Sequence, residues 1–489
     1  MFRRTKIIAT LGPATDDCRM LEKLIHAGID VVRLNFSHQT HEIHQKRLET
    51  LRTLAHAYGR YIGVMADLQG PKIRIEGFAQ GSIELQEGKQ FILDATLPSD
   101  QGDKHKVGIT YKQLPNDVYK GDILLLNDGR IVLKVKRVAE AQIVCKVMIG
   151  GPLSNHKGIN RQGGGLSAEA LTHKDRADIA FAAAMEVDYL AVSFPRSAED
   201  IHEARKLLQA VGSRGCIIAK IERAEALSNS EAIIKAADAI MVARGDLGVE
   251  IGDAHVPAAQ KSLLKKARDL NKITITATQM MESMIKNPIP TRAEVSDVAN
   301  AVFDGTDAIM LSAETAAGDY PDKAVIAMDR VCREAEKQPI ARTSDHRIAN
   351  QFGRIDEAIA MATMYTGNHL NIKAIAALTE SGSTPLWMSR INSGIPIFAL
   401  SRHLSTCTKV TLYRGVYPSN FDDLAHVNTQ QANQLVIDHL LRKGAVSPGD
   451  LMIITKGDLK GISGGTNLMK IVHVEEVEKP LTVPVVSTQ

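Results

Sequence analysis

Five apolar runs lie between Val187 and Glu314, and each of them ends in a polar or charged residue. In a sheet of parallel strands the carboxyl ends meet at one edge, so five such ends in succession predict a single site at that edge. The runs are 187–194, 216–222, 239–246, 272–279 and 307–314, and their tips carry Ser193, Lys220, Glu222, Asp246, Thr278, Ser312 and Glu314.

Three earlier runs, at 5–12, 30–37 and 62–69, have the same character and bring the number of expected strands to eight. Most neighbouring runs are separated by helical segments, such as the amphipathic stretch that stops at Gly28. Eight strands alternating with helices predict a (β/α)8 TIM barrel, which places its active site at the carboxyl ends of the strands. The alternative is an open doubly wound sheet. No Gly-x-Gly-x-x-Gly follows the first run, which disfavours a dinucleotide-binding form of that sheet.

The regular spacing breaks once, where residues 71–168 alternate with period two. Asn127-Asp128-Gly129 between two apolar runs predicts a tight hairpin. We therefore expect an all-β lid, a small β-barrel inserted after the third barrel strand. It is joined through Gly70-Pro71 and the glycine-rich run 158–167. A lid at this face can close over the site and exclude water.

After about residue 340 helices and strands alternate again, which predicts a C-terminal α/β domain. Its expected helix is 355–370 and its expected strands are 373–379, 395–401, 450–456 and 469–476. The predicted domains are a discontinuous barrel (1–70 and 169–340), the lid (71–168), the C-terminal α/β domain (341–478) and a tail (479–489).

Composition narrows the class of protein. A chain of 489 residues needs two or three domains, and a net charge of +3 with a pI of 8.4 is too mild to predict nucleic-acid binding. Five scattered cysteines without a Cys-x-x-Cys pair are typical of a reducing compartment. No run approaches the ~20 apolar residues of a membrane span, and no signal peptide is evident. We expect a cytoplasmic protein that binds neither nucleic acid nor membrane.

Lys220 and Glu222 are two residues apart on a strand, so their side chains share one face, and Asp246 ends the next strand. Two carboxylates at neighbouring strand ends with one cation favour a divalent metal ion between them. Oxygen-only ligands predict Mg²⁺, with Mn²⁺ as a substitute. The alternative is a structural Lys220–Glu222 ion pair, with Asp246 as a helix cap.

Anion-binding groups accompany this pair. Gly245 and its neighbours place unhindered backbone N–H groups at a predicted helix start, which suits a phosphate or carboxylate. Arg33 lies on the second strand and is aimed at the barrel mouth, where it can neutralise a transferring phosphoryl group. A second cradle is predicted in the C-terminal domain, with an ordinary Ser/Thr helix cap as the alternative. It consists of Thr379, Ser381, Gly382, Ser383 and Thr384, before Pro385.

These residues stand in motifs that resemble the pyruvate kinase family over almost the whole chain. The most specific are MVARGDLGVEI, TATQMMESM and DGTDAIMLSAETAAGDYP, joined by TKIIATLGPAT, VVRLNFSH, AKIE and TESGSTP. The resemblance is to a bacterial type without a long N-terminal extension. It implies a cytoplasmic phosphotransferase that converts phosphoenolpyruvate and ADP to pyruvate and ATP in the last step of glycolysis.

The resemblance also implies roles for individual residues. Glu222 and Asp246 match the Mg²⁺ ligands, and Lys220 the cation that stabilises the phosphoryl group and the developing enolate. Thr278 and Ser312 are candidates for the relay that protonates the enolate. The positions for phosphoenolpyruvate are Arg33, Lys220, Gly245, Asp246 and Thr278. Those for the nucleotide are Asn35, Ser37, His38, Arg74 and Lys157.

One position departs from many relatives. They bind K⁺ through residues that match Asn35, Ser37 and Asp67, with a glutamate where this chain has Lys72. A Lys ammonium is a compact fixed charge, so Lys72 can replace the monovalent cation. We expect activity that does not require K⁺. The alternative is a solvated Lys72, with K⁺ still bound at Asp67.

The resemblance further implies allosteric activation by a phosphorylated effector at 379–384, with the glycines of 461–465 closing over it, and a homotetramer. AMP and several sugar phosphates all offer a suitable phosphate group. Two other functions compete with this one: a phosphoenolpyruvate-using mutase or lyase, and a metabolite sensor without turnover. The inserted lid with Arg74 and Lys157 disfavours the first, and the presence of Lys220, Glu222 and Asp246 disfavours the second.

Overall fold

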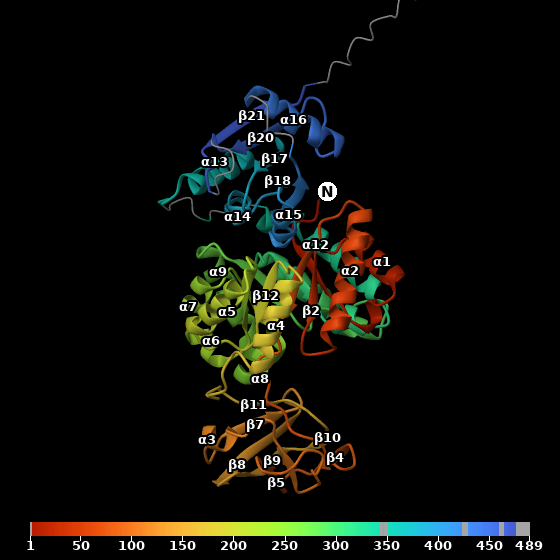
Figure 1. Cartoon of the computed structure of the whole chain (residues 1–489), viewed down its shortest axis with the longest axis vertical. Helices are drawn as coiled ribbons and strands as arrows, with labels where there is room; N and C mark the ends of the chain where they lie inside the picture. The colour runs from red at the N-terminus through yellow and green to blue at the C-terminus, as the bar shows by residue number, and fades with distance from the viewer. Residues whose placement is uncertain (1, 343–345, 347–350, 423–428, 459–463, 476–489) are drawn as a thin grey trace, which may run out of the picture. The chain divides into compact units, whose positions relative to one another are not determined.

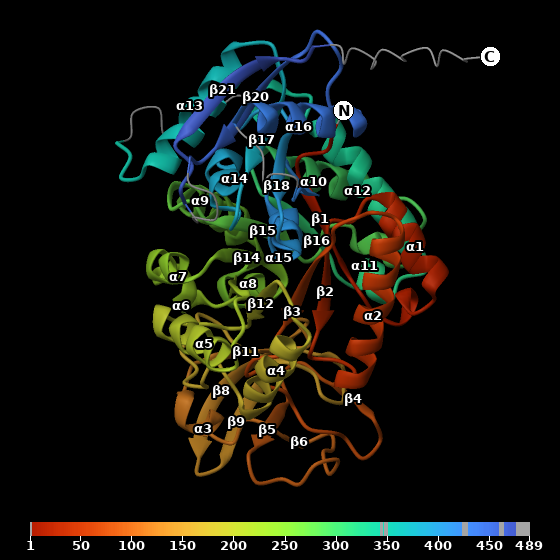
Figure 2. The same ribbon diagram turned by 45° about the horizontal axis from the view of Figure 1, so that its top comes forward.

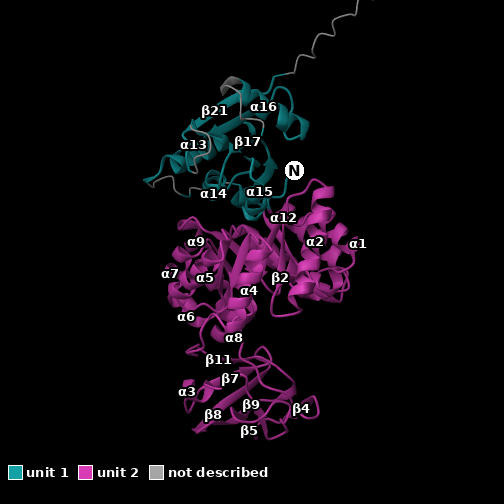
Figure 3. Cartoon of the chain, in the orientation of Figure 1, with its two compact units in different colours: residues 1–4, 336–489 teal, residues 5–335 magenta. Residues whose placement is uncertain are grey.

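The computed structural model describes the chain except for residues 1, 343–345, 347–350, 423–428, 459–463 and 476–489. The predicted tail and most of the glycine-rich run at 461–465 therefore lie outside the described residues. The described chain forms two compact units, Thr5–Ala335 and Met1–Arg4 with Glu336–Gln489 (Figure 3). The finer domain bounds stay a prediction.

The first unit contains a closed barrel of eight parallel strands, so the TIM barrel expected from the sequence is confirmed (Figures 1 and 2). In space the strands follow the order β1-β16-β15-β14-β13-β12-β3-β2. Their bounds are β1 Lys6–Thr10, β2 Val31–Asn35, β3 Gly63–Asp67, β12 Tyr189–Val192, β13 Cys216–Ile221, β14 Ala239–Ala243, β15 Ile273–Ala277 and β16 Ala308–Leu311.

Apolar side chains on both faces of the strands explain why they form the interior. Every residue of β1, β3, β12, β14, β15 and β16 is buried. The helices are amphipathic and cover the outside, as α1 (Cys18–Ala27) shows. Asp17 caps its first turn, and Gly28 ends it in the left-handed conformation (φ 97°), as its glycine predicted. The other outer helices of the barrel include α2 His41–Ala57, α4 His173–Ala184, α5 Ala198–Ala210, α7 Ser230–Ala236, α9 Val256–Asp269, α10 Arg292–Phe303 and α12 Pro321–Ala335.

The insert after β3 is all β apart from the short helix α3 (Leu114–Asp117). Its main sheet has the order β11-β7-β8-β9-β5-β6, with β11 and β6 at the edges, and β10 pairs separately with β4. The predicted hairpin joins β7 and β8, with Asn127 and Asp128 both at positive φ. The strands are β4 Ser82–Leu85, β5 Gln90–Asp94, β6 Lys106–Gly108, β7 Ile123–Leu126, β8 Ile131–Ala139, β9 Gln142–Ile149, β10 Gly151–Ser154 and β11 Ile159–Arg161.

The second unit is built on a five-stranded sheet of order β19-β18-β17-β20-β21. All pairs are parallel except β20 with β21. The four predicted strands are present, but β19 was missed because Pro418 and Ser419 interrupt its apolar pattern. The elements are α13 Ile355–His369, β17 Ile372–Leu378, α14 Ser383–Ser389, β18 Ile397–Ser401, α15 Leu404–Lys409, β19 Val416–Asn420, α16 Thr429–Arg442, β20 Leu451–Lys456 and β21 Leu468–His473. Among the described residues, every helix is too short or too polar to cross a bilayer.

Candidate active site at the rim of the barrel

Asp67, the last residue of β3, is the centre of a network of charges at the rim. Its Oδ2 accepts from Arg33 Nε at 2.6 Å, and Lys220 Nζ lies 3.2 Å from its Oδ1. The side chain of Asp67 is almost fully buried. Burial alone would raise the pKa of this carboxyl, but Lys220 and Arg33 outweigh burial and hold it below its usual range. Asp67 therefore stays ionised and fixes two cations, Arg33 on β2 and Lys220 near the end of β13.

Lys220 on β13 connects Asp67 to Glu222. Its ammonium lies 2.9 Å from Glu222 Oε1 and donates to Ser193 Oγ at 2.7 Å. Burial lowers the pKa of a lysine, yet the Asp67 and Glu222 carboxylates more than compensate and raise the pKa of Lys220 above its ordinary value. The ammonium keeps its proton, and its position is fixed from three sides.

Glu222 and Asp246 fit the oxygen-ligand pair expected for a divalent cation. The pKa of Glu222 is raised, first by burial and further by the charge of Asp246, while Lys220 opposes the shift. A cation between these carboxylates would relieve both effects. No cluster of three or more His, Cys, Asp or Glu side chains suited to a metal occurs in the described part of the chain. An ion held by two protein carboxylates keeps its remaining positions for water and substrate oxygens, as Mg²⁺ usually does.

Lys72 follows the first lid connection and lies against Asp246, with its Nζ 3.0 Å from Asp246 Oδ1. It is therefore not a merely solvated hinge residue. Of the residues expected at a K⁺ site, Asp67 contacts Arg33 and Lys220, and Asn35 Oδ1 accepts from the backbone N–H of Ser37 at 3.1 Å.

Thr278, just after β15, has an unusual backbone. Its φ of 67° is uncommon for a β-branched residue, and the following Gln279 also has a positive φ. Thr278 Oγ1 accepts from the N–H of Gly245 at 2.8 Å and donates to the carbonyl of Ala277 at 2.6 Å. Arg244 Nη2 donates to the carbonyls of Thr278 and Gln279 at 2.8 and 3.2 Å. These bonds hold the Thr278 hydroxyl beside the start of α8 (Arg244–Ile251).

Ser312 follows β16, and its backbone N–H donates to Glu314 Oε2 at 2.7 Å. Its hydroxyl is buried and has no hydrogen-bond partner among the described residues. The second relay candidate thus has a hydroxyl whose proton is not committed to a protein acceptor.

The nucleotide candidates come from the barrel and the lid. His38 lies after β2, and burial together with the charges of Arg74, Arg33 and Lys72 lowers its pKa. Because the charge of Arg74 lowers the pKa of His38, this lid residue lies near the barrel rim. Arg74 Nη1 also donates to the carbonyl of His156 at 3.0 Å, and Lys157 follows in the same turn.

In the second unit the cradle begins at Thr379, whose Oγ1 accepts from the N–H of Gly382 at 2.9 Å. Gly382 precedes α14 at φ 83°, where a side chain would be strained. Lys409 Nζ donates to the carbonyl of Ser381, and Thr384 is hydrogen-bonded to Thr466. The exposed side chains of Arg402 and His403 both contact Glu380. Ser383 is the first residue of α14.

The sequence named most of these residues but not their connections. It had no signal for Asp67 as the shared partner of Arg33 and Lys220, since the pairing depends on barrel register. The bond from the Phe194 N–H to Glu222 Oε2 at 2.9 Å was also missed. The contacts by which Arg244 anchors Thr278 and Gln279 were not predicted either. The only hint in the sequence was the position of Arg244 directly before Gly245 and Asp246.

Known proteins are similar to this chain over almost its whole length. Residues 2–325 match the profile of the family described as pyruvate kinase, barrel domain, and residues 357–472 match that of the pyruvate kinase alpha/beta domain. The chain is 56% identical over 480 residues to pyruvate kinase II of Salmonella typhimurium, covering 97% of this chain and 99% of that protein. It is 54% identical to pyruvate kinase of Haemophilus influenzae over 460 residues, 93% of this chain and 96% of the relative. A crystal structure of a pyruvate kinase from Cryptosporidium parvum superposes with a TM-score of 0.89 at 33% identity, covering 96% of both chains.

Proposed function

Because this chain belongs to the pyruvate kinase family, we propose that the network around Asp67 is the place where it transfers the phosphoryl group. The activity is the transfer from phosphoenolpyruvate to ADP, which gives pyruvate and ATP, and the family generally depends on a divalent metal. The observation that carries the proposal is the pair of cations, Arg33 and Lys220, held on one buried carboxylate at the strand ends. Fixed cations at this position are suited to a trianionic phosphate ester.

In this proposal Glu222 and Asp246 hold Mg²⁺, with Mn²⁺ as a substitute. The ion supplies charge neutralisation at the phosphate and carboxylate oxygens when it is bound. Arg33 and Lys220 orient the phosphoryl group, and Lys220 faces the oxygen on which enolate charge develops. Gly245 offers its backbone next to the substrate carboxylate.

Thr278 and Ser312 are the proposed proton relay. Thr278 Oγ1 is fixed between the Gly245 N–H and the Ala277 carbonyl, which sets its direction. The buried Ser312 hydroxyl has its proton available for transfer. Phosphoryl transfer leaves an enolate, which needs one proton at carbon to become pyruvate, and these hydroxyls are the proposed route for it.

The proposed nucleotide site consists of Asn35, Ser37 and His38 on the barrel with Arg74 and Lys157 on the lid. Closure of the lid would bring its two cations to the ADP phosphates and exclude water. We also propose that Lys72 replaces the K⁺ ion of many relatives, because its ammonium already lies 3.0 Å from Asp246. Turnover in tetramethylammonium buffer without K⁺ should stay near its full value, and a tenfold loss would contradict this.

The cradle of Thr379, Ser381, Gly382, Ser383 and Thr384 is the proposed site for the phosphate of an allosteric activator, AMP or a sugar phosphate. Its support is the combination of hydroxyls, the Gly382 turn and the nearby cations Lys409 and Arg402. We further infer a homotetramer in the cytoplasm, as the sequence resemblance implied.

A coupled assay tests the function and its metal. ATP formation from phosphoenolpyruvate and ADP should require Mg²⁺ and stop when EDTA is added. A mutase or lyase would consume phosphoenolpyruvate without ADP, and a sensor would bind it without turnover. Glu222→Gln should raise the half-saturating Mg²⁺ concentration about 10- to 100-fold. An unchanged metal dependence would remove Glu222 from the site.

A further inference from the structure

Glu250 is a buried carboxylate that the proposed mechanism does not use. It lies on α8 four residues after Asp246, so the two side chains are neighbours along one face of this helix. Glu250 is 3% exposed. A carboxylate at this depth requires hydrogen-bond partners, and the identity of those partners indicates what it does.

The side chain of Glu250 holds the loop that follows the other metal candidate. Glu250 Oε2 accepts from the backbone N–H of Ala224 at 2.9 Å, and Ala224 is two residues after Glu222. Glu222 follows β13 and Asp246 follows β14, and these two strands are paired as far as Ile221 and Val242. The hydrogen bond between Glu250 and Ala224 connects the segments after the two strands a second time.

The backbone of Glu250 holds the lid. Its carbonyl accepts from the N–H of Gly163 at 3.0 Å, in the segment through which the lid returns to the barrel. Two neighbours of Ala224 contact the same return segment. Arg223 Nη2 donates to the carbonyl of Leu166 at 3.3 Å, and Glu225 accepts from the N–H of Gly165. The loop after Glu222 and the helix of Asp246 therefore share one attachment to the lid.

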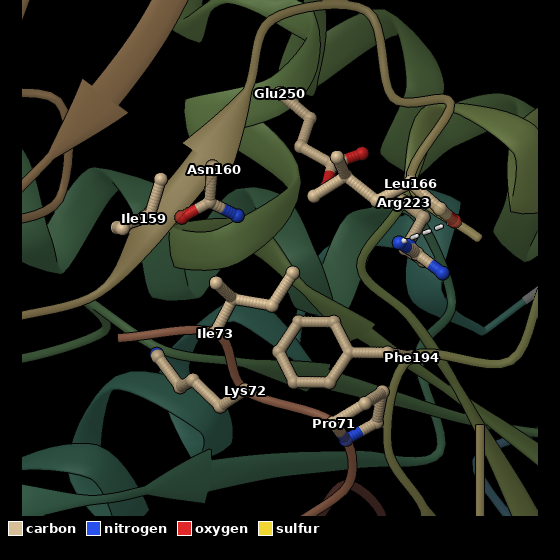
Figure 4. A pocket seen from close by; sticks show the side chains of 9 residues that line it. All are labelled: Pro71, Lys72, Ile73, Ile159, Asn160, Leu166, Phe194, Arg223 and Glu250. Atoms are coloured by element: carbon tan, nitrogen blue, oxygen red, sulfur yellow. Dashed lines mark hydrogen bonds between the residues drawn. The ribbon is translucent and has the colours of Figure 1, made fainter. Parts of the chain in front are cut away.

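Three of these residues, Glu250, Arg223 and Leu166, help to line a pocket at the root of the lid (Figure 4). Glu250 and Arg223 line it from the barrel and Asn160 from β11. Arg223 is 3% exposed, and its Nε and Nη1 have no hydrogen-bond partner among the described residues. Its guanidinium interacts electrostatically with Glu250, and Asn160 is hydrogen-bonded to the same carboxylate. Removal of the Glu250 side chain would leave Arg223 without this counter-charge in a buried place.

We propose that Glu250 is a positioning residue: it keeps the Glu222 and Asp246 carboxylates at the spacing that one metal ion requires, and it fastens both to the return segment of the lid. The inference rests on the proposed assignment of Glu222 and Asp246 as metal ligands. The hydrogen bond to Ala224 needs an acceptor at the end of a side chain of this length. Gln offers such an acceptor, whereas Ala and Asp do not reach.

Metal binding without turnover tests the proposal on the full chain. The dissociation constant of Mn²⁺ is measured by electron paramagnetic resonance, with no substrate present. Glu250→Ala should weaken Mn²⁺ binding about tenfold, the lower end of what loss of a supporting residue does to a metal site. The Mn²⁺ dissociation constant of Glu250→Gln should stay within about twofold of the wild type, because the acceptor for Ala224 is kept. Hydrogen exchange at the Ala224 amide should become faster in Glu250→Ala and Glu250→Asp but not in Glu250→Gln. If Glu250→Ala does not fold, Glu250→Asp takes its place.

Glu225→Ala is the matched control, because Glu225 contacts the same lid segment but does not join the two ligand-bearing elements. It should bind Mn²⁺ like the wild type. The proposal is overturned if Glu250→Ala binds Mn²⁺ normally, or if Glu225→Ala weakens binding equally. Glu222→Gln separates the two levels of inference. If Glu222→Gln also binds normally, the metal assignment itself is wrong. If Glu222→Gln loses Mn²⁺ while Glu250→Ala keeps it, only the role of Glu250 fails.

Discussion

The barrel rim and the C-terminal cradle are both suited to phosphate groups, but they are built differently. At the rim, Asp67, Lys220 and Glu222 are almost completely buried, and each charge is held by another charge. The proposed cradle consists instead of hydroxyl-bearing residues around a glycine turn, in which Thr379 Oγ1 accepts from the N–H of Gly382. The nearest ion pair, Arg402 with Glu380, has side chains that are 49% and 26% exposed.

This difference determines how each site responds to change. In a buried network the loss of one charge leaves its partner without compensation, because water cannot replace it. Beside the cradle the Arg402–Glu380 ion pair is partly exposed, so water and salt compensate for a lost charge and the pair contributes little. Substitutions at the rim should therefore abolish chemistry, whereas substitutions in the cradle should alter only regulation.

Lys220→Met should have the largest effect. It removes the cation between Asp67 and Glu222, which is also the group proposed to stabilise the developing enolate. We expect kcat to fall about 10³-fold, the upper range for loss of one preorganised charge-stabilising group. The measurement is ATP formation at saturating phosphoenolpyruvate, ADP and Mg²⁺.

The matched control is Lys235→Met, which removes a surface lysine paired with Glu231 one helical turn away. Because exposed ion pairs contribute little, kcat of this variant should stay within about twofold of the wild type. A loss of less than tenfold in folded Lys220→Met would show that the buried rim tolerates change as the cradle does.

Arg244→Lys should have the second largest effect. The guanidinium donates to the carbonyls of Thr278 and Gln279 and also binds Asp297. A Lys ammonium cannot make this planar set of bonds. Relaxation of the positive φ at Thr278 would displace its hydroxyl, and a shift of about 1 Å can lower kcat about 10²-fold.

Arg205→Lys is the control for Arg244, because Arg205 also joins a backbone carbonyl, that of Ala236, to an aspartate, Asp238. It lies away from the rim residues, so kcat should not change. An equal loss in both variants would mean that Arg244 stabilises the fold and does not position Thr278.

The sequence predicted the barrel and the identity of the rim residues because both are local signals. Apolar runs with β-branched residues predict buried strands, and the residue after each run lies at the carboxyl edge. The left-handed turn at Gly28 and the Asn127-Asp128-Gly129 hairpin were equally local. Each needs a backbone conformation that only a few residue types adopt readily.

The connections between strands could not be predicted in this way. Asp67 joins Arg33, 34 residues earlier, to Lys220 across a register that only the closed barrel fixes. Glu250 lies within the MVARGDLGVEI motif, but its partner is the backbone N–H of Ala224, a contact that no sequence pattern indicates. β19 escaped because Tyr417-Pro418-Ser419 lacks the apolar run of a buried strand. Side-chain identity is local information, whereas pairing is a property of the assembled sheet.

Lys72→Glu should have a smaller effect that depends on the salt. The substitution replaces the ammonium beside Asp246 with a carboxylate and so creates a need for a monovalent cation. In the absence of K⁺ we expect turnover to fall about tenfold or more, and K⁺ should restore most of it, since ~1.4 kcal/mol of electrostatic stabilisation corresponds to a factor of ten. Lys136→Glu, on an exposed part of β8, is the charge-matched control. An equal loss of turnover with and without K⁺ would contradict the proposal that Lys72 replaces the K⁺ ion.

Ser383→Asp should leave basal turnover unchanged. A carboxylate at the first residue of α14 repels an incoming phosphate, so the response to AMP or a sugar phosphate should disappear. The measurement is the phosphoenolpyruvate saturation curve with and without each effector. Ser405→Asp, on the exposed side of α15, should respond like the wild type. A full response in Ser383→Asp would exclude the cradle as the effector site.

Glu250→Gln should leave turnover within about twofold of the wild type and change the pH dependence of stability. Burial, aided by the charge of Glu225, raises the pKa of Glu250 to about 7 from its ordinary value of 4.5. A raised pKa means that the folded protein holds a proton which the unfolded chain releases between these values. The stabilisation from that proton is complete below pH 4.5 and is lost as the pH rises through 7.

Glutamine cannot ionise, so the unfolding free energy of the variant minus that of the wild type should increase by about 3 kcal/mol between pH 4.5 and 8. Urea unfolding at four pH values measures this difference. Glu231→Gln, at an exposed position, should show no such increase, and a flat difference for Glu250→Gln would mean that the carboxylate at the lid root is solvated like a surface acid.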